Sequence, residues 1–234
     1  MVGCCGFAMP QERYFATFPV VEIQQTFYQP PQVATAERWR ERAPEEFQFT
    51  LKAWQLITHP ASSPTYRRLR EALTEAARER CGFFRDTEEM WAAWERTDEI
   101  RATLRAPLVV FQCPARFTPT EEHIENLRRF FSRVPRSGWA PVWEPRGEWP
   151  NDVVASLCRE LELTHCVDPF AAESVGGKIV YYRLHGKTGY RYRYTDADLR
   201  WLAGQIPRRR RVYCLFNNVS MAEDAQRFLG VAKR

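Results

Sequence analysis

The sequence lacks the marks of a membrane or secreted protein. Its 234 residues contain no run of about 18 apolar residues, so we expect no membrane span. The first residues have neither the charged stretch nor the long apolar stretch of a signal peptide, and we therefore expect a cytoplasmic protein. In that compartment the seven cysteines should stay mostly reduced.

Common motifs of catalysis and cofactor binding are also missing. The sequence has no G-x-G-x-x-G, P-loop, G-x-S-x-G, H-E-x-x-H or C-x-x-C pattern. Its four histidines are scattered, which argues against a zinc centre rich in histidine. Adjacent Cys4 and Cys5 point to opposite sides of a strand, so an iron–sulfur cluster is disfavoured and buried, apolar cysteines are expected.

What the sequence does contain is enough for one large folded domain. Hydrophobic residues make up 44% of the chain and aromatic residues 14%, which argues for a packed core and against disorder. The length suits an α/β barrel, and we expect residues 1–234 to form a single domain. The net charge is +5, and four arginines at 208–211 nearly account for it. We interpret this run as a solvated loop, with a nucleic-acid or phosphate contact as the alternative.

Strands and helices alternate along the chain. Eight segments have the apolar or β-branched character of strands, namely residues 2–5, 20–24, 48–52, 108–112, 141–144, 164–168, 179–185 and 212–217. Most intervals between them can hold a helix, which predicts a parallel sheet, and eight such strands predict a closed (β/α)8 barrel of the TIM type. We expect weak or missing helices after the first and sixth strands and a long helical insertion after the third. An open doubly wound sheet is the alternative, disfavoured by the missing nucleotide motifs.

Capping patterns indicate where several helices begin. The predicted starts are Thr118-Pro-Thr-Glu121, Thr195-Asp-Ala-Asp198, Ser220-Met-Ala-Glu223, Thr35 and Asn151. The insertion after the third strand is long enough for two helices, near residues 66–80 and 87–104.

Polar side chains gather at the carboxyl ends of the predicted strands. In the second strand, Val21 and Ile23 point one way and Glu22 and Gln24 the other. The same alternation in the other strands puts polar groups at the end of the barrel where active sites lie. The candidate catalytic residues are Glu22, Glu144, Asp168 and His185, and the candidate ligand-binding residues are Gln24, Tyr28, Lys52, Gln112, Arg146, Trp149, Arg183, Asn217 and Asn218.

These residue types allow more than one chemistry. The carboxylates can act as general acid and base, or can bind a divalent cation such as Mg²⁺ or Mn²⁺, so a metal cofactor stays an open alternative. Lys52, Arg146 and Arg183 suit a phosphate or carboxylate ligand. The structural alternative is that three cations and three carboxylates neutralise one another, with His185 as a hydrogen-bonded structural residue.

Several longer stretches together resemble one family. They are Val21-Glu-Ile-Gln-Gln-Thr-Phe-Tyr28, Phe49-Thr-Leu-Lys-Ala-Trp-Gln-Leu-Ile-Thr-His59, Trp143-Glu-Pro-Arg146, Tyr182-Arg-Leu-His-Gly186 and Leu215-Phe-Asn-Asn218. The chain resembles the DUF72 (YecE-like) family nearly end to end, and its opening Gly3-Cys-Cys-Gly-Phe is similar to a shorter, archaeal-style branch. The resemblance implies a β/α barrel distantly akin to those of endonuclease IV and xylose isomerase. It implies no settled activity, and the zinc-binding histidines of endonuclease IV are not matched.

Three functional hypotheses follow. The first is an enzyme, a hydrolase or an isomerase, that acts on a polar or anionic small molecule such as a sugar or a phosphorylated metabolite. The second is a hydrolase acting on nucleic acid, favoured by the arginine run and by the alternation Tyr190-Arg-Tyr-Arg-Tyr194, which can stack on bases and bind phosphates. The third is a binding protein without catalysis. The sequence predicts no oligomeric state.

Overall fold

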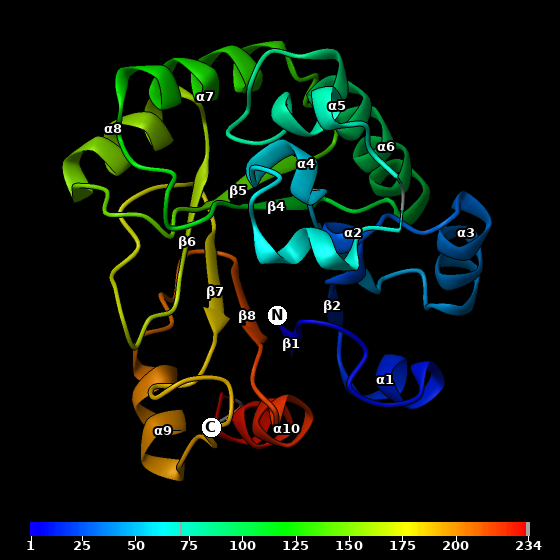
Figure 1. The fold of residues 1–234 in the computed structure, drawn as a ribbon. Helices are drawn as coiled ribbons and strands as arrows, with labels where there is room; N and C mark the ends of the chain where they lie inside the picture. The colour runs from blue at the N-terminus through cyan, green and yellow to red at the C-terminus, as the bar shows by residue number, and fades with distance from the viewer. Residues whose placement is uncertain (71, 233–234) are drawn as a thin grey trace.

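Eight parallel strands close into a barrel in the order in which they occur along the chain (Figure 1). The computed structural model describes residues 1–70 and 72–232. The strands are β1 (Val2–Cys4), β2 (Val20–Ile23), β3 (Gln48–Lys52), β4 (Leu108–Gln112), β5 (Ala140–Glu144), β6 (Thr164–Val167), β7 (Val180–Leu184) and β8 (Val212–Phe216). The pairing of β1 with β8 completes the barrel. All eight predicted strands are confirmed, and every predicted end lies within one residue of the observed end.

Helices surround the strands on the outside, as Figure 1 shows. They are α1 (Gln11–Thr17), α2 (Gln25–Tyr28), α3 (Val33–Arg42), α4 (Gln55–Thr58), the 3₁₀ helix η1 (Pro64–Arg68), α5 (Glu75–Glu79), α6 (Glu88–Leu104), α7 (Glu121–Arg133), α8 (Asn151–Glu160), α9 (Asp196–Gly204) and α10 (Met221–Ala232). Within the described part of the chain, no helix has the length and apolar character needed to cross a membrane.

The predicted irregularities of the barrel are confirmed. Only the seven-residue α1 separates β1 from β2, and the fully described stretch between β6 and β7 contains no helix. Between β3 and β4 the chain instead forms α4, η1, α5 and α6. The predicted TIM-type barrel with a helical insertion after its third strand is therefore the observed fold.

Helix starts were predicted with mixed success. At α9 the predicted capping box is present, with the side chains of Thr195 and Asp198 each accepting a backbone N–H of the other residue. At α7 the prediction is wrong by two residues, because Thr120, not Thr118, accepts the N–H of His123 and caps the helix.

Two further capping predictions are wrong. Helix α3 begins at Val33, ahead of Thr35, and Asn151 is the first helical residue of α8, after Pro150. Proline places the chain at the start of α8 because its fixed backbone angle suits the position before the first turn.

The predicted helix at residues 66–80 is also wrong in the part that the structure describes. The chain forms η1, leaves the helical conformation at Leu69, and starts α5 after Thr74, whose hydroxyl caps it. Residue 71 lies outside the described residues. Arg70 donates its backbone N–H to the Gln29 side chain, and the Tyr66 hydroxyl donates to the backbone of His59. These contacts with neighbouring loops compete with the helix-forming propensity of the segment.

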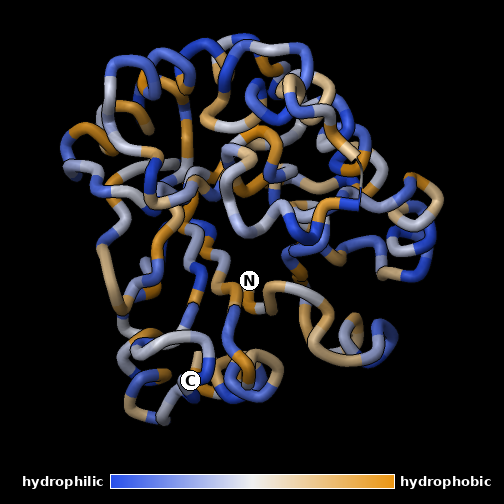
Figure 2. Tube along the Cα trace, viewed as in Figure 1, coloured by the Kyte–Doolittle hydropathy of each residue, from blue (hydrophilic) through white to orange (hydrophobic). Residues whose placement is uncertain are grey.

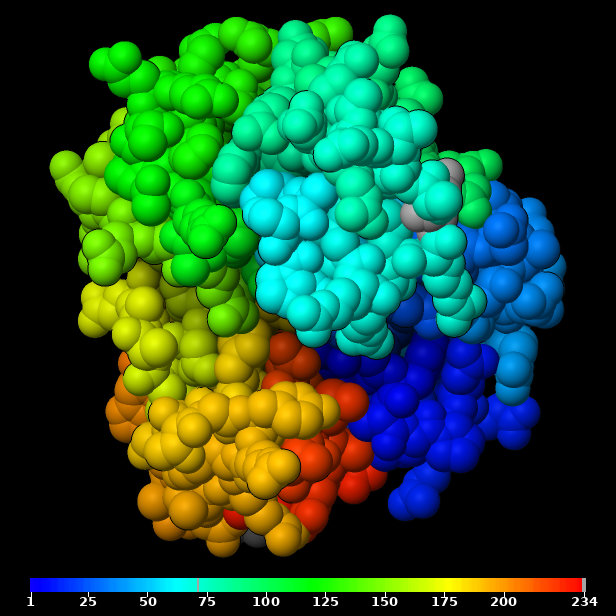
Figure 3. Space-filling model, viewed as in Figure 1, coloured from blue at the N-terminus to red at the C-terminus, as the bar shows by residue number. Residues whose placement is uncertain are grey.

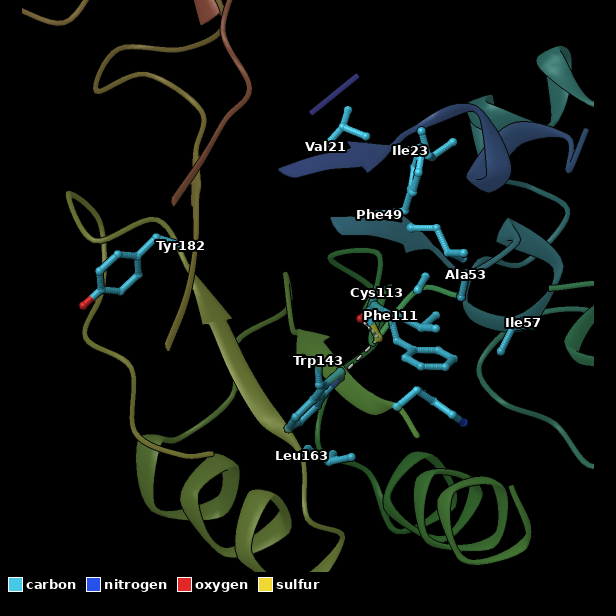
Figure 4. Close-up of a cluster of buried hydrophobic side chains, with 14 of the residues drawn as sticks. Val21, Ile23, Phe49, Ala53, Ile57, Phe111, Cys113, Trp143, Leu163 and Tyr182 are labelled. Carbon is cyan, nitrogen blue, oxygen red and sulfur yellow. Dashed lines mark hydrogen bonds between the residues drawn. The ribbon is translucent and has the colours of Figure 1, made fainter. Parts of the chain in front are cut away.

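The core has two parts, divided by the alternation of side chains along the strands. Outward-facing residues such as Phe111 and Trp143 pack against the helices in one large cluster (Figure 4), where the Trp143 indole N–H donates to the Cys113 sulfur. Inward-facing residues such as Val110, Val142 and Tyr181 form a separate cluster inside the barrel. Figure 2 shows the apolar colour recurring along the strands, while the peripheral helices carry many hydrophilic residues.

Cys4 and Cys5 follow the same division. Cys4 belongs to the outer cluster and Cys5 to the interior of the barrel, as their adjacent positions at the end of β1 predict. Both are buried, and burial raises the pKa of the Cys4 thiol to about 12. A thiol with so high a pKa stays protonated at neutral pH and packs as a small apolar group.

Candidate functional site

The interior of the barrel changes from apolar to charged toward the carboxyl ends of the strands. Val20 and Leu108 belong to the apolar interior near the beginning of their strands. The inward-facing side chains at the carboxyl ends are polar and buried or nearly so, namely Glu22, Lys52, Gln112, Glu144 and Arg183. The structure thus brings together five of the residues that the sequence predicts for a site, and we call these five the polar cluster.

Arg183, on β7, lies at the centre of this cluster. Its Nη2 forms an ion pair with Glu22 Oε1 at 3.0 Å. Its Nη1 forms an ion pair with Glu144 and also donates to Gln112 Oε1 at 2.9 Å. The residue has no exposed surface. Burial alone would lower the pKa of Arg183, but Glu144 and Glu22 raise it well above its usual value, so the guanidinium stays charged. Arg183 is thus a fixed cation between two carboxylates.

Glu22 accepts hydrogen bonds from two further side chains. Its Oε2 accepts the Tyr181 hydroxyl at 2.8 Å, and that hydroxyl also lies 2.8 Å from the Thr50 hydroxyl. Its Oε1 accepts the side-chain amide of Gln24. Tyr181 is not among the residues predicted from the sequence, although its inward parity, two residues before Arg183, indicates a position in the site.

Glu144, at the end of β5, is the second carboxylate on Arg183. Burial by itself would raise its pKa, but the charges of Arg183 and Arg146 outweigh that effect and lower the pKa to about 2. Arg146 Nε donates to Glu144 Oε1 at 2.8 Å, and the Arg146 side chain is 40% exposed. The charge pair is therefore buried on one side and open to ligands on the other.

His185 and Asp168 border the open side. Arg146 Nη2 lies 2.7 Å from His185 Nε2, and because an arginine can only donate, this nitrogen must accept and carries no proton. The remaining proton is on Nδ1, which lies 3.8 Å from Asp168 Oδ2. Asp168 itself accepts the backbone N–H groups of Phe170 and His185 at 3.0 and 2.8 Å. Asp168 thus organises the loops after β6 and β7, and the His185 ring is oriented by Arg146.

Lys52 differs from the other charged members of the cluster. Among the residues that the structure describes it forms no ion pair, and its ammonium donates to Gln112 Oε1 at 3.1 Å and lies 3.8 Å from the centre of the Phe27 ring. Burial, and after it the charge of Arg183, lower the pKa of Lys52 from 10.5 to about 7. The nearby carboxylates are already held by arginines, which is why they do not restore the usual value.

The remaining predicted residues separate into two groups. Gln24, Tyr28 and Asn217 line a pocket of about 460 Å³ beside the polar cluster. Trp149 and Asn218 have structural contacts instead. The Trp149 indole donates to the backbone oxygen of Phe117 at 2.6 Å and packs on the outer core, whereas Asn218 is buried and donates to the Asp224 carboxylate and to a backbone oxygen of the loop after β7.

The predicted carboxylates do not suit a metal ion in this arrangement. The guanidinium of Arg183 lies between Glu22 and Glu144, where a cation bridging them would lie. Over residues 1–70 and 72–232, no three side chains of histidine, cysteine, aspartate or glutamate converge closely enough to hold a metal. A cation already neutralises these glutamates, and we derive no chemistry through a metal.

The two features that favoured nucleic acid lie at opposite ends of the barrel. The stretch from Tyr190 to Tyr194 follows β7 at the carboxyl end, whereas the arginines at 208–211 precede β8 at the amino end. A pocket of about 660 Å³ is also at the amino end, where Leu108, Ala140 and Thr164 line it. We place the site at the carboxyl end because the polar cluster is there.

A family comparison agrees with this fold. A family model described as "Protein of unknown function DUF72" matches residues 10–233. The chain belongs to the DUF72 family. Among curated proteins no sequence match is found for this DUF72 chain.

Solved structures extend the comparison. A DUF72 protein from Enterococcus faecalis is 20% identical with a TM-score of 0.75, over 99% of this chain and 96% of that one. A DUF72 protein from Thermotoga maritima is 17% identical with a TM-score of 0.70, over 100% and 99% of the two chains. A xylose isomerase domain containing protein from Salmonella typhimurium is 14% identical with a TM-score of 0.62, over 99% and 97%. At these identities the likeness shows the barrel fold alone.

Proposed function

We propose that this DUF72 barrel is an enzyme that transfers protons on a polar, anionic small molecule at the carboxyl end of its strands. The observation that carries the proposal is Lys52, a buried amine at the end of β3 whose pKa is lowered to about 7. An amine with this pKa is present in both protonation states at neutral pH, so it can accept a proton and return it. A lysine that served only as a counter-ion would be paired with a carboxylate, and the described residues give it none.

The surrounding charges fit this role. Arg183 holds Glu22 and Glu144 in fixed positions, so the field around Lys52 needs no rearrangement when charge develops on a substrate. The partly exposed Arg146 can bind the anionic group of the substrate. Removal of a proton from a carbon next to a carbonyl group would place that proton on Lys52 Nζ and the electron pair on the carbonyl oxygen. Return of that proton to the former carbonyl carbon, together with transfer of the hydroxyl proton of the adjacent carbon to the former carbonyl oxygen, would complete an isomerisation.

The similarity to a xylose isomerase domain containing protein makes isomerisation one candidate reaction for this fold, and the similarity to an AP endonuclease of family 2 from Brucella melitensis keeps hydrolysis as the other. The likeness to the xylose isomerase domain containing protein is one of fold, and it makes a sugar a candidate substrate for this chain. The binding hypothesis without catalysis predicts a ligand that stabilises the protein and is never converted. The hypothesis of a nucleic-acid hydrolase predicts oligonucleotide binding that weakens steeply with salt.

The test combines a ligand screen with a direct assay of proton transfer. Aldoses, ketoses and their phosphates are first screened for a rise in melting temperature, together with divalent metals, nucleotides and oligonucleotides. Ligands that stabilise the protein are then incubated in D₂O, and deuterium incorporation next to the carbonyl is followed by NMR. We expect incorporation with the wild type and its loss in Lys52→Met.

Lys178→Met is the matched control, because Lys178 is exposed and pairs with Glu162 away from the polar cluster. The control should keep the wild-type rate. A Lys52→Met variant that incorporates deuterium as fast as the wild type would rule out Lys52 as the proton carrier.

A further inference from the structure

A pocket lined by both aromatic and polar side chains adjoins the polar cluster on the side of β1, β2 and β8. Its volume is about 460 Å³, within the size range of small-molecule sites. Gln24 connects the two, because it lines the pocket and its amide donates to Glu22. Figure 3 shows the blue amino-terminal segment, the cyan segment after β3 and the gold segment after β7 meeting on this face of the molecule.

The cationic wall of the pocket is Arg68, in η1. The centre of its guanidinium lies 3.6 Å from the centre of the Tyr28 ring. A guanidinium held against an aromatic face keeps its N–H groups at the edge, where they can donate to an anion in the fork geometry that suits phosphate. The position of Arg68 is thus set by Tyr28, and its donors remain available to a ligand in the pocket.

Aromatic rings and amides form the other walls. Phe7, Trp39 and Tyr190 line the pocket together with the amides of Gln24 and Asn217, and Tyr190 is 60% exposed. Aromatic faces bind the C–H side of a sugar ring, and amides both donate to and accept from hydroxyl groups. One cation, flat apolar walls and several amides therefore match a ligand with one anionic group and a hydroxylated ring.

We propose that this pocket binds a phosphorylated sugar, with its phosphate on Arg68 and its ring between the aromatic walls. The proposal names the substrate class of the function proposed above and rests on it for the reaction. Gln24, which lines the pocket and donates to Glu22 of the polar cluster, directs the unphosphorylated end of the ligand toward Glu22 and its neighbours.

Calorimetric titration of the full-length protein with four probes tests the proposal. The probes are glucose 6-phosphate, glucose, inorganic phosphate and AMP. We expect glucose 6-phosphate to bind at least about tenfold more tightly than either glucose or inorganic phosphate, because the ring and the phosphate each contribute contacts. We expect Arg68→Met to remove this preference, with affinity falling by about tenfold or more, as for the loss of a charged contact to phosphate.

Arg67→Met is the matched control, because Arg67 is the neighbouring exposed arginine of η1 and does not line the pocket. An equal loss of affinity for glucose 6-phosphate in the two variants would show an effect of general surface charge and overturn the proposal. The absence of binding by every probe would also overturn it. Binding of AMP in place of glucose 6-phosphate, with the same dependence on Arg68, would support the site. It would also show that the phosphorylated sugar recognised there is part of a nucleotide. A wild-type protein that binds glucose 6-phosphate but shows no deuterium incorporation would keep this proposal and reject the proposed reaction.

Discussion

At the scale of single residues, the least conventional group is Lys52, an ammonium buried without an ion pair among the described residues. Its folded-state pKa of about 7 lies below the unfolded value of 10.5, so between these values the unfolded chain binds more protons than the folded chain. Stability therefore rises with pH across this window, and below it the full cost of burying the charge remains. An unpaired ammonium in the interior lowers the stability of the fold. A functional role explains such a residue better than packing does.

The corresponding prediction concerns the pH dependence of unfolding. Between pH 7 and pH 8.5 the wild type should gain roughly 1.5 kcal/mol of unfolding free energy relative to Lys52→Met, in which the titrating amine is absent. Urea unfolding of both proteins across this range measures the difference, and the titration of the cysteines cancels in it because both proteins contain them. Parallel pH curves for the two proteins would mean that Lys52 has a normal pKa.

At the scale of elements, the connection between β6 and β7 depends on one histidine. Within this helix-free segment, Val175 donates its backbone N–H to His165 Nδ1 at 3.2 Å, and the Ser174 hydroxyl donates to the His165 backbone oxygen at 3.1 Å. Burial lowers the pKa of His165 from 6.5 to about 4, because a buried imidazolium is costly. Protonation would also remove the acceptor that Val175 uses.

We therefore expect acid to loosen this connection before the carboxylates titrate. His165 contributes stability above pH 6.5 that is lost as the pH falls toward 4, about 2 kcal/mol by pH 5. Hydrogen exchange should show faster exchange of residues 169–178 at pH 5 than at pH 7.5, after correction for the intrinsic rate. In His165→Asn, whose side-chain oxygen can replace Nδ1 as a neutral acceptor, this acid-induced change should disappear. If it persists there, other groups, such as the buried His59, control the segment.

At the scale of the whole molecule, the barrel was predictable from the sequence because each strand is buried on both sides. Apolar residues and strict alternation then define each strand and the direction of each side chain, which is how Glu22, Glu144 and Arg183 could be assigned to one end. Arg68 was not predictable as a site residue, because it comes from an insertion whose path depends on contacts with distant loops. Polar residues after a strand were ambiguous for a related reason. The sequence cannot distinguish Asn218, which binds a neighbouring helix, from Asn217, which lines the pocket.

Closure of the barrel depends on β1, which has only three residues. Its central residue, Gly3, pairs with Val20 of β2 and Leu215 of β8 and so connects the two ends of the sheet. A Cβ atom at Gly3 would lie 2.0 Å from the backbone oxygen of Val20, which is too close for any side chain. At this point β1 can therefore approach β2 this closely only with glycine.

We expect Gly3→Ala to destabilise the whole barrel and not β1 alone, because a closed sheet opened at one seam leaves unpaired backbone groups on both edges. Chemical unfolding should show a loss of several kcal/mol, in the range of severe core substitutions. Gly230→Ala is the control, since nothing lies within 4 Å of a Cβ there and alanine favours the α10 helix by about 1 kcal/mol. A Gly3→Ala protein as stable as the wild type would show that β1 can shift away from Val20 and that the seam tolerates a gap.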